Sequence, residues 1–308
     1  MISIVFPGQG SQKIGMGSDL HNEFDFVKKI FKQADEVLGY SISDLILNGS
    51  QDKLNQTTYT QPAIYLVGYS ICEILKKKNI FFEKKINFLA GHSLGEYTAL
   101  TYAGAFSFEQ GLLLLKSRGE AMQSAVPLGE GGMLAVLGSE INEIQTLIDK
   151  NSDSFECYLA NDNSKGQVIL SGKKSNLEKF ANLLKEKKIK NINLPVSAPF
   201  HCKLMRNATF KMENIIKQQK LNFPKIKVVS NVTATEYNDT EEIKKLLIKQ
   251  IESPVRWRES IEYMISQGTT VFIEIGPGKV LSGLIKRINK DVKVLNIDKL
   301  EDIEQIDL

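Results

Sequence analysis

A serine flanked by glycines is the first feature of this sequence that could carry out chemistry. The pentapeptide at residues 91–95, Gly-His-Ser-Leu-Gly, follows an apolar run, residues 86–90, and precedes a helix-compatible stretch. Glycines around the serine allow the strained turn that pushes a hydroxyl out of a sheet, and a helix N-terminus favours developing negative charge. A plain glycine-rich turn explains the pentapeptide alone about equally well. The strand before it and the helix after it favour Ser93 as a nucleophile.

A serine nucleophile needs a base, and the chain has only three histidines, His21, His92 and His201. His92 belongs to the serine turn itself, and His21 begins a predicted surface helix. His201 follows a predicted strand and a proline, at an edge between elements where functional side chains often project. A lone histidine is more often structural than catalytic, but the scarcity of histidine favours His201 as the general base.

One arginine falls where the pattern predicts an aliphatic residue. A capping box at residues 107–110 starts a helix that is apolar almost all round, and Arg118 lies on its line of Leu114 and Ala121. The planar fork of a buried arginine suits a carboxylate in a bidentate pair. A guanidinium that reaches water or meets an ordinary glutamate is the more common arrangement, and the pattern alone favours it.

The amino-terminal loop is a second glycine-rich turn. Residues 2–6 predict a buried strand, and residues 7–12, Pro-Gly-Gln-Gly-Ser-Gln, follow it. The loop does not fit a phosphate-binding motif because Lys13 takes the position of the third glycine. Its glycines allow a close backbone approach that would free the amide of Gln9 to face a ligand, although a plain tight turn is equally compatible.

Composition excludes several classes of function. The 308 residues carry a net charge of +3 from 39 basic and 36 acidic side chains, which gives no electrostatic case for nucleic acid. Cys72, Cys157 and Cys202 are far apart without metal-ligand spacing, so we expect a reducing compartment and no metal. The amino-terminal apolar run is too short for a signal peptide and no stretch is long enough for a bilayer. We expect a cytoplasmic protein that does not bind membranes.

The elements around these residues predict an α/β fold, with an α/β-hydrolase-like core and a mainly parallel sheet. Over residues 132–198 the predicted elements follow the order β-α-β-β-α-β, which is the order of a ferredoxin-like subdomain inserted in the larger unit. Residues 1–131 and 199–308 would then form a large catalytic domain. In the small subdomain we expect strand 133–137, helix 139–150, strands 157–160 and 167–171, helix 177–186 and strand 192–196. In the large domain we expect helices at 19–38, from Pro62 to 75, at 107 onward, 239–250 and 279–288, and strands at 2–6, 86–90, 271–275 and 292–297.

Taken together, the serine turn, Arg118 and His201 make the sequence resemble the malonyl-CoA:acyl carrier protein transacylases of bacterial fatty-acid synthesis, within the acyltransferase family. The resemblance covers nearly the whole chain, and several independent motifs occur in the order of the family. These motifs are residues 6–12, 91–97, 118–119, 195–202, 253–257 and 274–278.

The resemblance implies a Ser-His dyad in which Ser93 is the nucleophile and His201 the base. A backbone carbonyl near Gln250 would orient the histidine in place of an acid. The implied reaction is ping-pong: malonyl-CoA acylates the serine, and the phosphopantetheine thiol of acyl carrier protein takes the malonyl group. Coenzyme A thioester and carrier protein are the implied partners. No permanently bound cofactor is implied, and we expect a monomer.

The resemblance also implies the residues that bind the substrate. Arg118 would clamp the malonyl carboxylate, and the backbone amides of Gln9 and Leu94 would form the oxyanion hole. Phe200, directly before the histidine, resembles the malonyl-selective form of the family. Methylmalonyl-selective polyketide relatives commonly have serine there, although some malonyl-specific bacterial enzymes also do.

Three other functions compete with this one. A serine esterase or thioesterase of the α/β-hydrolase class shares the serine turn, but its histidine normally lies near the end of the chain after an acid, whereas about a third of this chain follows His201. A trans-acting polyketide acyltransferase would use another acyl donor. A carrier-protein docking module with a dead site is disfavoured because Ser93, His201 and Arg118 are all present.

Overall fold

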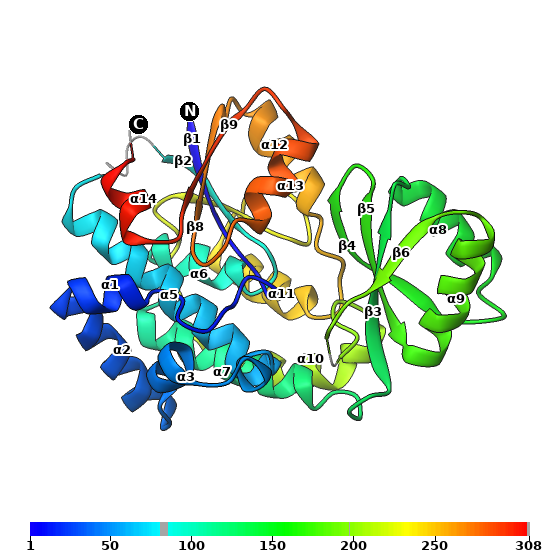
Figure 1. The fold of residues 1–308 in the computed structure, drawn as a ribbon, viewed down its shortest axis with the longest axis horizontal. Helices are drawn as coiled ribbons and strands as arrows, with labels where there is room; N and C mark the ends of the chain where they lie inside the picture. Colours follow the sequence, from blue (N-terminus) through cyan, green and yellow to red (C-terminus); the bar gives the residue numbers. More distant parts are fainter. Residues whose placement is uncertain (81–85, 197, 307–308) are drawn as a thin grey trace.

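The structure, a computed structural model, describes residues 1–80, 86–196 and 198–306. It has two regions that lie beside each other (Figure 1). The large region comprises the described residues up to 130 and from 198 onward and contains a five-stranded sheet; the small region, residues 131–196, contains a four-stranded sheet. The predicted domain boundaries, 1–131 with 199–308 and 132–198, stay a prediction, and Ser197 of the 195–202 motif lies outside the described residues.

The sheet of the large region is parallel throughout, which confirms the predicted α/β class. Its strand order is β7-β2-β1-β8-β9, and each neighbouring pair is parallel. β-Branched and aromatic residues dominate the central strands because such a sheet is buried on both faces. The strands are β1 (Ile2–Phe6), β2 (Ile86–Gly91), β7 (Lys227–Val229), β8 (Val271–Ile275) and β9 (Lys293–Ile297).

Helices cover both faces of this sheet, since alternate side chains of each strand point to opposite sides. Ile4 and Phe6 pack in one apolar cluster, whereas Val5 packs in another with Trp257. The cluster of Ile4 also takes residues from α1 (Ser18–Glu23), α2 (Asp25–Leu38), α3 (Ile42–Asn48), α4 (Gln51–Leu54), α5 (Thr57–Lys77), α6 (Gly95–Tyr102), α7 (Phe108–Gln123), the 3₁₀ helix η2 (Lys203–Met205), α10 (Arg206–Lys217), α11 (Thr240–Gln250) and α14 (Leu300–Glu304). The cluster of Val5 takes residues from α12 (Trp257–Ser266) and α13 (Val280–Ile288).

Two predicted helix boundaries in the large region were wrong. The helix expected over 19–38 is two helices, because Phe24 has an extended backbone (φ −113°, ψ 112°) and Asp25 starts a second N-terminus. Helix α5 begins at Thr57, so Pro62 lies inside the helix and does not open it. Pro62 has no backbone N–H to donate within the helix. Thr57 and Thr60 are buried, and their packing keeps the preceding turn helical despite this missing hydrogen bond.

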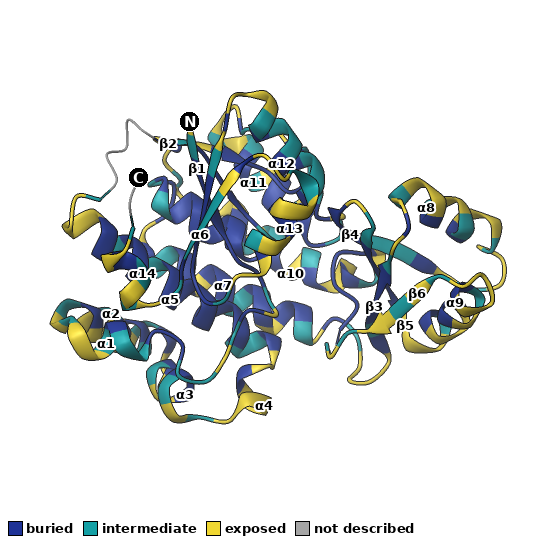
Figure 2. Ribbon diagram, turned by 45° about the horizontal axis from the view of Figure 1, so that its top comes forward, coloured by how far each residue is buried: buried dark blue, intermediate teal, exposed yellow. Residues whose placement is uncertain are grey.

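The small region has the predicted ferredoxin-like order. Its strands run β4-β5-β3-β6, and every neighbouring pair is antiparallel. Its elements are β3 (Gly131–Leu137), α8 (Ile141–Lys150), β4 (Cys157–Ser164), β5 (Gln167–Lys173), α9 (Lys174–Glu186) and β6 (Lys190–Asn193). Leu134 and Val136 pack under the two helices, whereas Met133 and Ala135 join the cluster of the large region. One face of the small sheet is therefore turned toward the large region, and buried residues follow that boundary in Figure 2.

Helix α9 begins at Lys174, before the predicted residue 177, and β6 covers residues 190–193, where 192–196 was predicted. Strand β4 ends at Ser164, beyond the predicted limit of residue 160. Its last part is polar but buried, and Asn161 forms a parallel bridge with Val255 of the large region. Asparagine and aspartate are uncommon in strands, so the two asparagines and the aspartate of this segment did not predict one. Among the described residues, no helix is long and apolar enough to cross a membrane.

Candidate active site

Ser93 lies in a strained turn at the carboxyl end of β2, directly before α6. Its φ is 54°, in the left-handed region that non-glycine residues rarely adopt. The flanking glycines are required by space: a Cβ on Gly91 would lie 1.9 Å from the carbonyl carbon of Gly95, and one on Gly95 would lie 2.3 Å from the carbonyl oxygen of Phe6. The turn therefore has the shape that the sequence predicted, at the edge where parallel strands place ligands.

Asn231, which follows β7, holds this turn in place. Its side-chain oxygen accepts a hydrogen bond from the backbone N–H of Ser93 at 2.7 Å, and its side-chain nitrogen donates to the carbonyl of Gly91 at 2.7 Å. The side chain is fully buried. Sequence reasoning found no role for Asn231, and its Asn-x-Thr surroundings gave no signal of this contact.

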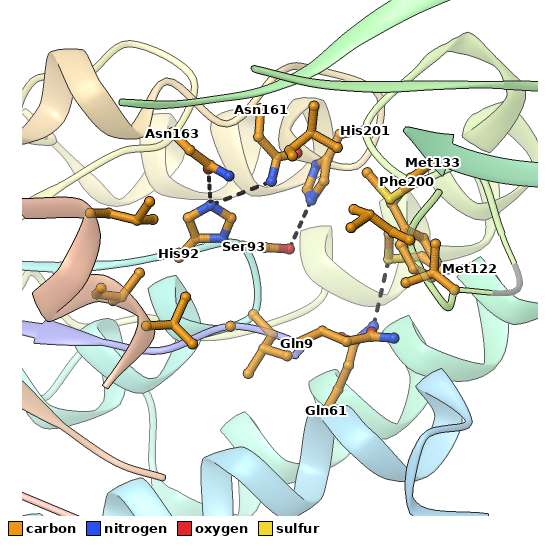
Figure 3. A pocket seen from close by; sticks show the side chains of 18 of the residues that line it. Gln9, Gln61, His92, Ser93, Met122, Met133, Asn161, Asn163, Phe200 and His201 are labelled. Carbon is orange, nitrogen blue, oxygen red and sulfur yellow. Dashed lines mark hydrogen bonds between the residues drawn. The ribbon is translucent and has the colours of Figure 1, made fainter. Parts of the chain in front are cut away.

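His201 lies beside the serine and is almost completely buried. Its Nε2 is 2.8 Å from the hydroxyl of Ser93, and its Nδ1 is 2.9 Å from the backbone carbonyl of Gln250 (Figure 3 shows the first contact). A carbonyl only accepts, so Nδ1 carries the proton and Nε2 is free to accept one from Ser93. Burial, assisted by the nearby Arg118, lowers the pKa of His201 to about 3. The ring is therefore neutral at neutral pH.

Arg118 of α7 reaches the same serine and is 1% exposed, so it does not extend to water. Its Nη1 donates to the side-chain oxygen of Gln61 at 2.7 Å, and its Nη2 donates to that of Gln250 at 2.9 Å. Nη2 also lies 3.1 Å from the hydroxyl of Ser93. None of these hydrogen bonds goes to a carboxylate, so two neutral amides hold a cation that they do not neutralise.

A cavity of about 190 Å³ opens over these groups and is walled by both regions. Gln9, Leu94 and Phe200, for which the family resemblance implied substrate binding, all line it, and their roles stay a prediction. Leu94 immediately precedes α6, where backbone N–H groups lack intrahelical partners. The apolar part of the wall consists of Met122, Met133, Ile169, Leu194, Val196, Phe200, Val280, Leu281 and Leu284.

His92 connects the serine turn to the small region. Its Nε2 lies 2.9 Å from the side-chain oxygen of Asn163 and 3.4 Å from the side-chain nitrogen of Asn161, both on β4 (Figure 3). Burial lowers the pKa of His92, so this contact is made by a neutral ring. A salt bridge of 2.8 Å between Asp162 and Arg258 of α12 joins the same strand to the large region. Nothing in the sequence pattern indicated these contacts.

The residues described by the structure include no group of three or more histidine, cysteine, aspartate or glutamate side chains that could hold a metal ion. The three cysteines are free and buried.

The hydrogen bonds described above form a single group, which consists of Ser93, His201, Arg118 and the carbonyl of Gln250. This arrangement can transfer a proton from a hydroxyl and can present a cation to an anionic group next to it.

Comparisons with known proteins agree over the full length. Residues 4–301 match the acyl transferase domain family. The malonyl CoA-acyl carrier protein transacylase of Bacillus subtilis (strain 168) is 41% identical over 305 residues, which span 98% of this chain and 95% of that protein. The crystal structure of acyl-carrier-protein-S-malonyltransferase from Bartonella henselae has a TM-score of 0.95 and 39% identity, covering 98% of this chain and 97% of that one. A structure of a type II PKS acyl-carrier protein in complex with its malonyl-transacylase has a TM-score of 0.94 and 36% identity, covering 98% and 97%.

Proposed function

The chain belongs to the acyl transferase family, among the malonyl-CoA:acyl carrier protein transacylases, and we infer that it transfers a malonyl group from malonyl-CoA to acyl carrier protein. It is accordingly an S-malonyltransferase of fatty-acid synthesis. The observation that carries this inference is the placement of Arg118, an unneutralised guanidinium, 3.1 Å from a serine hydroxyl that also contacts a histidine. An acyl group bearing a carboxylate fits such a site.

We propose that Ser93 is the nucleophile and His201 the base. Nε2 of His201 takes the hydroxyl proton as the serine oxygen forms a bond with the thioester carbon. The carbonyl oxygen becomes an oxyanion, which the backbone amides of Gln9 and Leu94 stabilise. When the carbon–sulfur bond breaks, His201 returns the proton to the sulfur, coenzyme A leaves and a malonyl-serine remains. The phosphopantetheine thiol of the carrier protein repeats these steps in reverse.

Substrate choice is assigned to Arg118 and Phe200. The guanidinium would pair with the distal carboxylate of the malonyl group, and an acetyl group would leave this buried cation without a partner. Phe200 lines the cavity and is 6% exposed, a position from which its ring would limit the space for a branched acyl group. Gln250 would orient the histidine through its carbonyl, in place of the carboxylate of a triad.

The test is the mass of the intact protein after mixing with malonyl-CoA in the absence of an acceptor. Wild type is expected to gain one malonyl group, and Ser93→Ala is expected to gain none. Adding a carrier-protein thiol should then remove the adduct, with formation of malonyl-carrier protein in preference to free malonate. Absence of an adduct from folded wild type would refute the function, and release mainly as malonate would favour a thioesterase.

We further propose that acyl carrier protein is the physiological acceptor, that the enzyme works as a monomer in the cytoplasm, and that it needs no resident cofactor. The complex between a PKS acyl-carrier protein and its malonyl-transacylase, in a relative of the same fold, supports the first of these. Light scattering during size-exclusion chromatography tests the monomer. Full activity after exhaustive dialysis against a chelator would support the absence of a cofactor.

A further inference from the structure

A buried carboxyl lies behind the Gln250 side chain that contacts Arg118. The Gln250 side chain accepts from Nη2 of Arg118 through its oxygen, and it donates through its nitrogen to the carboxylate of Glu96, 154 positions away in the chain. Glu96 stands in the first turn of α6, three residues after Ser93, and is 1% exposed. The proposed chemistry gives this buried carboxyl no role.

Three groups donate hydrogen bonds to Glu96. The backbone N–H of Asn231 lies 3.3 Å from each of its oxygens, and the hydroxyl of Tyr237 and the side-chain nitrogen of Gln250 complete the set. A carboxylate accepts hydrogen bonds only, whereas a protonated carboxyl also donates one. These surroundings therefore suit the ionised form of Glu96, although burial opposes it.

The orientation of the Gln250 amide follows from this. Its nitrogen donates to Glu96 and, at 3.1 Å, to the backbone carbonyl of Ser93, which leaves its oxygen directed at Arg118. A proton on Glu96 would weaken this group as an acceptor, so the amide would lose part of the contact that fixes its orientation. An amide turned over would face the guanidinium with its nitrogen, and two donors would meet without an acceptor between them.

We propose that Glu96 is a positioning residue for the recognition of the malonyl carboxylate: it orients the side chain of Gln250, which in turn holds Arg118 beside Ser93. This inference rests on the proposed malonyl transfer. Because the Gln250 side chain lies between Glu96 and Arg118, the buried guanidinium has an anion close by without a direct ion pair. Arg118 thereby stays available for a carboxylate of the substrate.

The pKa of Glu96 also bears on its role. Burial raises the pKa of Glu96 to about 7, while its hydrogen bonds with Tyr237, Gln250 and Asn231 and the charge of Arg118 oppose the rise. The titratable groups that face it are Arg118 from α7, Tyr237 from the segment before α11 and Tyr97 from its own helix. Burial raises the pKa of both tyrosines, that of Tyr97 to about 12. Of these groups, only Glu96 changes charge near neutral pH.

The sign of the pH effect follows. Above its pKa Glu96 is ionised and Gln250 points its oxygen at Arg118; as the pH falls through about 7, Glu96 takes up a proton and holds the amide less firmly in this orientation. We expect kcat/KM for malonyl-CoA to fall on this acid limb. The acylation of Ser93 by acetyl-CoA, which does not use Arg118, should lack the limb, because the pKa of His201 lies near 3.

The direct test is Glu96→Gln, which keeps the size of the side chain and adds a donor. We expect kcat/KM for malonyl-CoA to fall about 10- to 100-fold, mainly through KM, while the rate of acetyl adduct formation on Ser93 changes less than about threefold. In an Arg118→Ala background the same exchange should have no further effect on the malonyl to acetyl ratio. Equal losses with both thioesters would reduce Glu96 to a structural residue and overturn the proposal.

Tyr237→Phe is the matched control, since it removes a donor from the same carboxylate and leaves Gln250 untouched. The Tyr237 hydrogen bond lowers the pKa of Glu96, so its loss should move the acid limb to higher pH with the alkaline plateau unchanged. The limb should vanish in Glu96→Gln. The wild-type and Tyr237→Phe profiles decide the matter even if Glu96→Gln fails to fold, and a limb of the same position with acetyl-CoA would refute the proposal. Failure of wild type to form any malonyl adduct would instead refute the proposed function.

Discussion

The two regions that wall the cavity contribute different kinds of group. The large region contributes the strained serine, His201 and the Arg118 guanidinium, whereas the small region contributes the neutral amides of Asn161 and Asn163 and part of the apolar wall. Carboxyl ends of parallel strands meet at one edge, where turns and helix N-termini can collect reactive groups. A face of an antiparallel sheet offers side chains in rows, which suits a wall. The serine, the histidine and the guanidinium thus all come from the large region, whereas both regions supply the apolar wall.

The comparison predicts that substitutions of the serine, histidine and arginine of the large region have larger effects than substitutions in the small region. The largest effect is expected for His201→Ala. Without Nε2 at 2.8 Å from Ser93, the hydroxyl has no base, and the rate of malonyl adduct formation should fall about 10⁴-fold or more. Rapid-quench mass spectrometry measures this rate, with Ser93→Ala as the baseline. A loss of less than tenfold would mean that the base lies elsewhere.

Arg118→Ala should have the next largest effect. We expect kcat/KM for malonyl-CoA to fall about 10²- to 10³-fold, since a charge-assisted pair with the substrate is lost, and relative activity with uncharged acyl groups to rise. Arg118→Lys, the matched control, keeps the charge but lacks the fork that reaches both Gln61 and Gln250, so it should be intermediate. An unchanged preference for malonyl over acetyl would remove Arg118 from substrate recognition.

The smallest effects are expected for an asparagine-to-alanine substitution, made once in each region. Asn231→Ala removes the hydrogen bonds to the N–H of Ser93 and to the carbonyl of Gly91, so we expect kcat to fall about tenfold and the free energy of unfolding to fall by about 2 kcal/mol. Asn163→Ala loses its contact with His92 and should raise KM a few-fold at nearly constant kcat. Steady-state kinetics and calorimetric unfolding measure both. If Asn163→Ala lowered kcat as much as Asn231→Ala, the division of roles between the regions would be wrong.

Much of the fold was predictable because it rests on local preference. The strand of residues 2–6 and the turn at 91–95 follow from β-branched runs and glycine spacing, and the ferredoxin-like order follows from alternating periodicity. The short strand β7 and the polar end of β4 were missed. Three residues carry too little pattern, and Asn161 and Asn163 are buried by contacts with the large region that no local pattern encodes.

The sequence by itself determined the reactive residue types, the shape of the serine turn and the family resemblance, because each depends on residues adjacent in the chain. The tertiary structure alone decided that amides surround Arg118, that Asn231 holds the serine turn and that Glu96 faces Gln250. These contacts join residues 132, 138 and 154 positions apart. Their hydrogen bonds form only after packing has buried the partners together, since water satisfies the same groups in the unfolded chain.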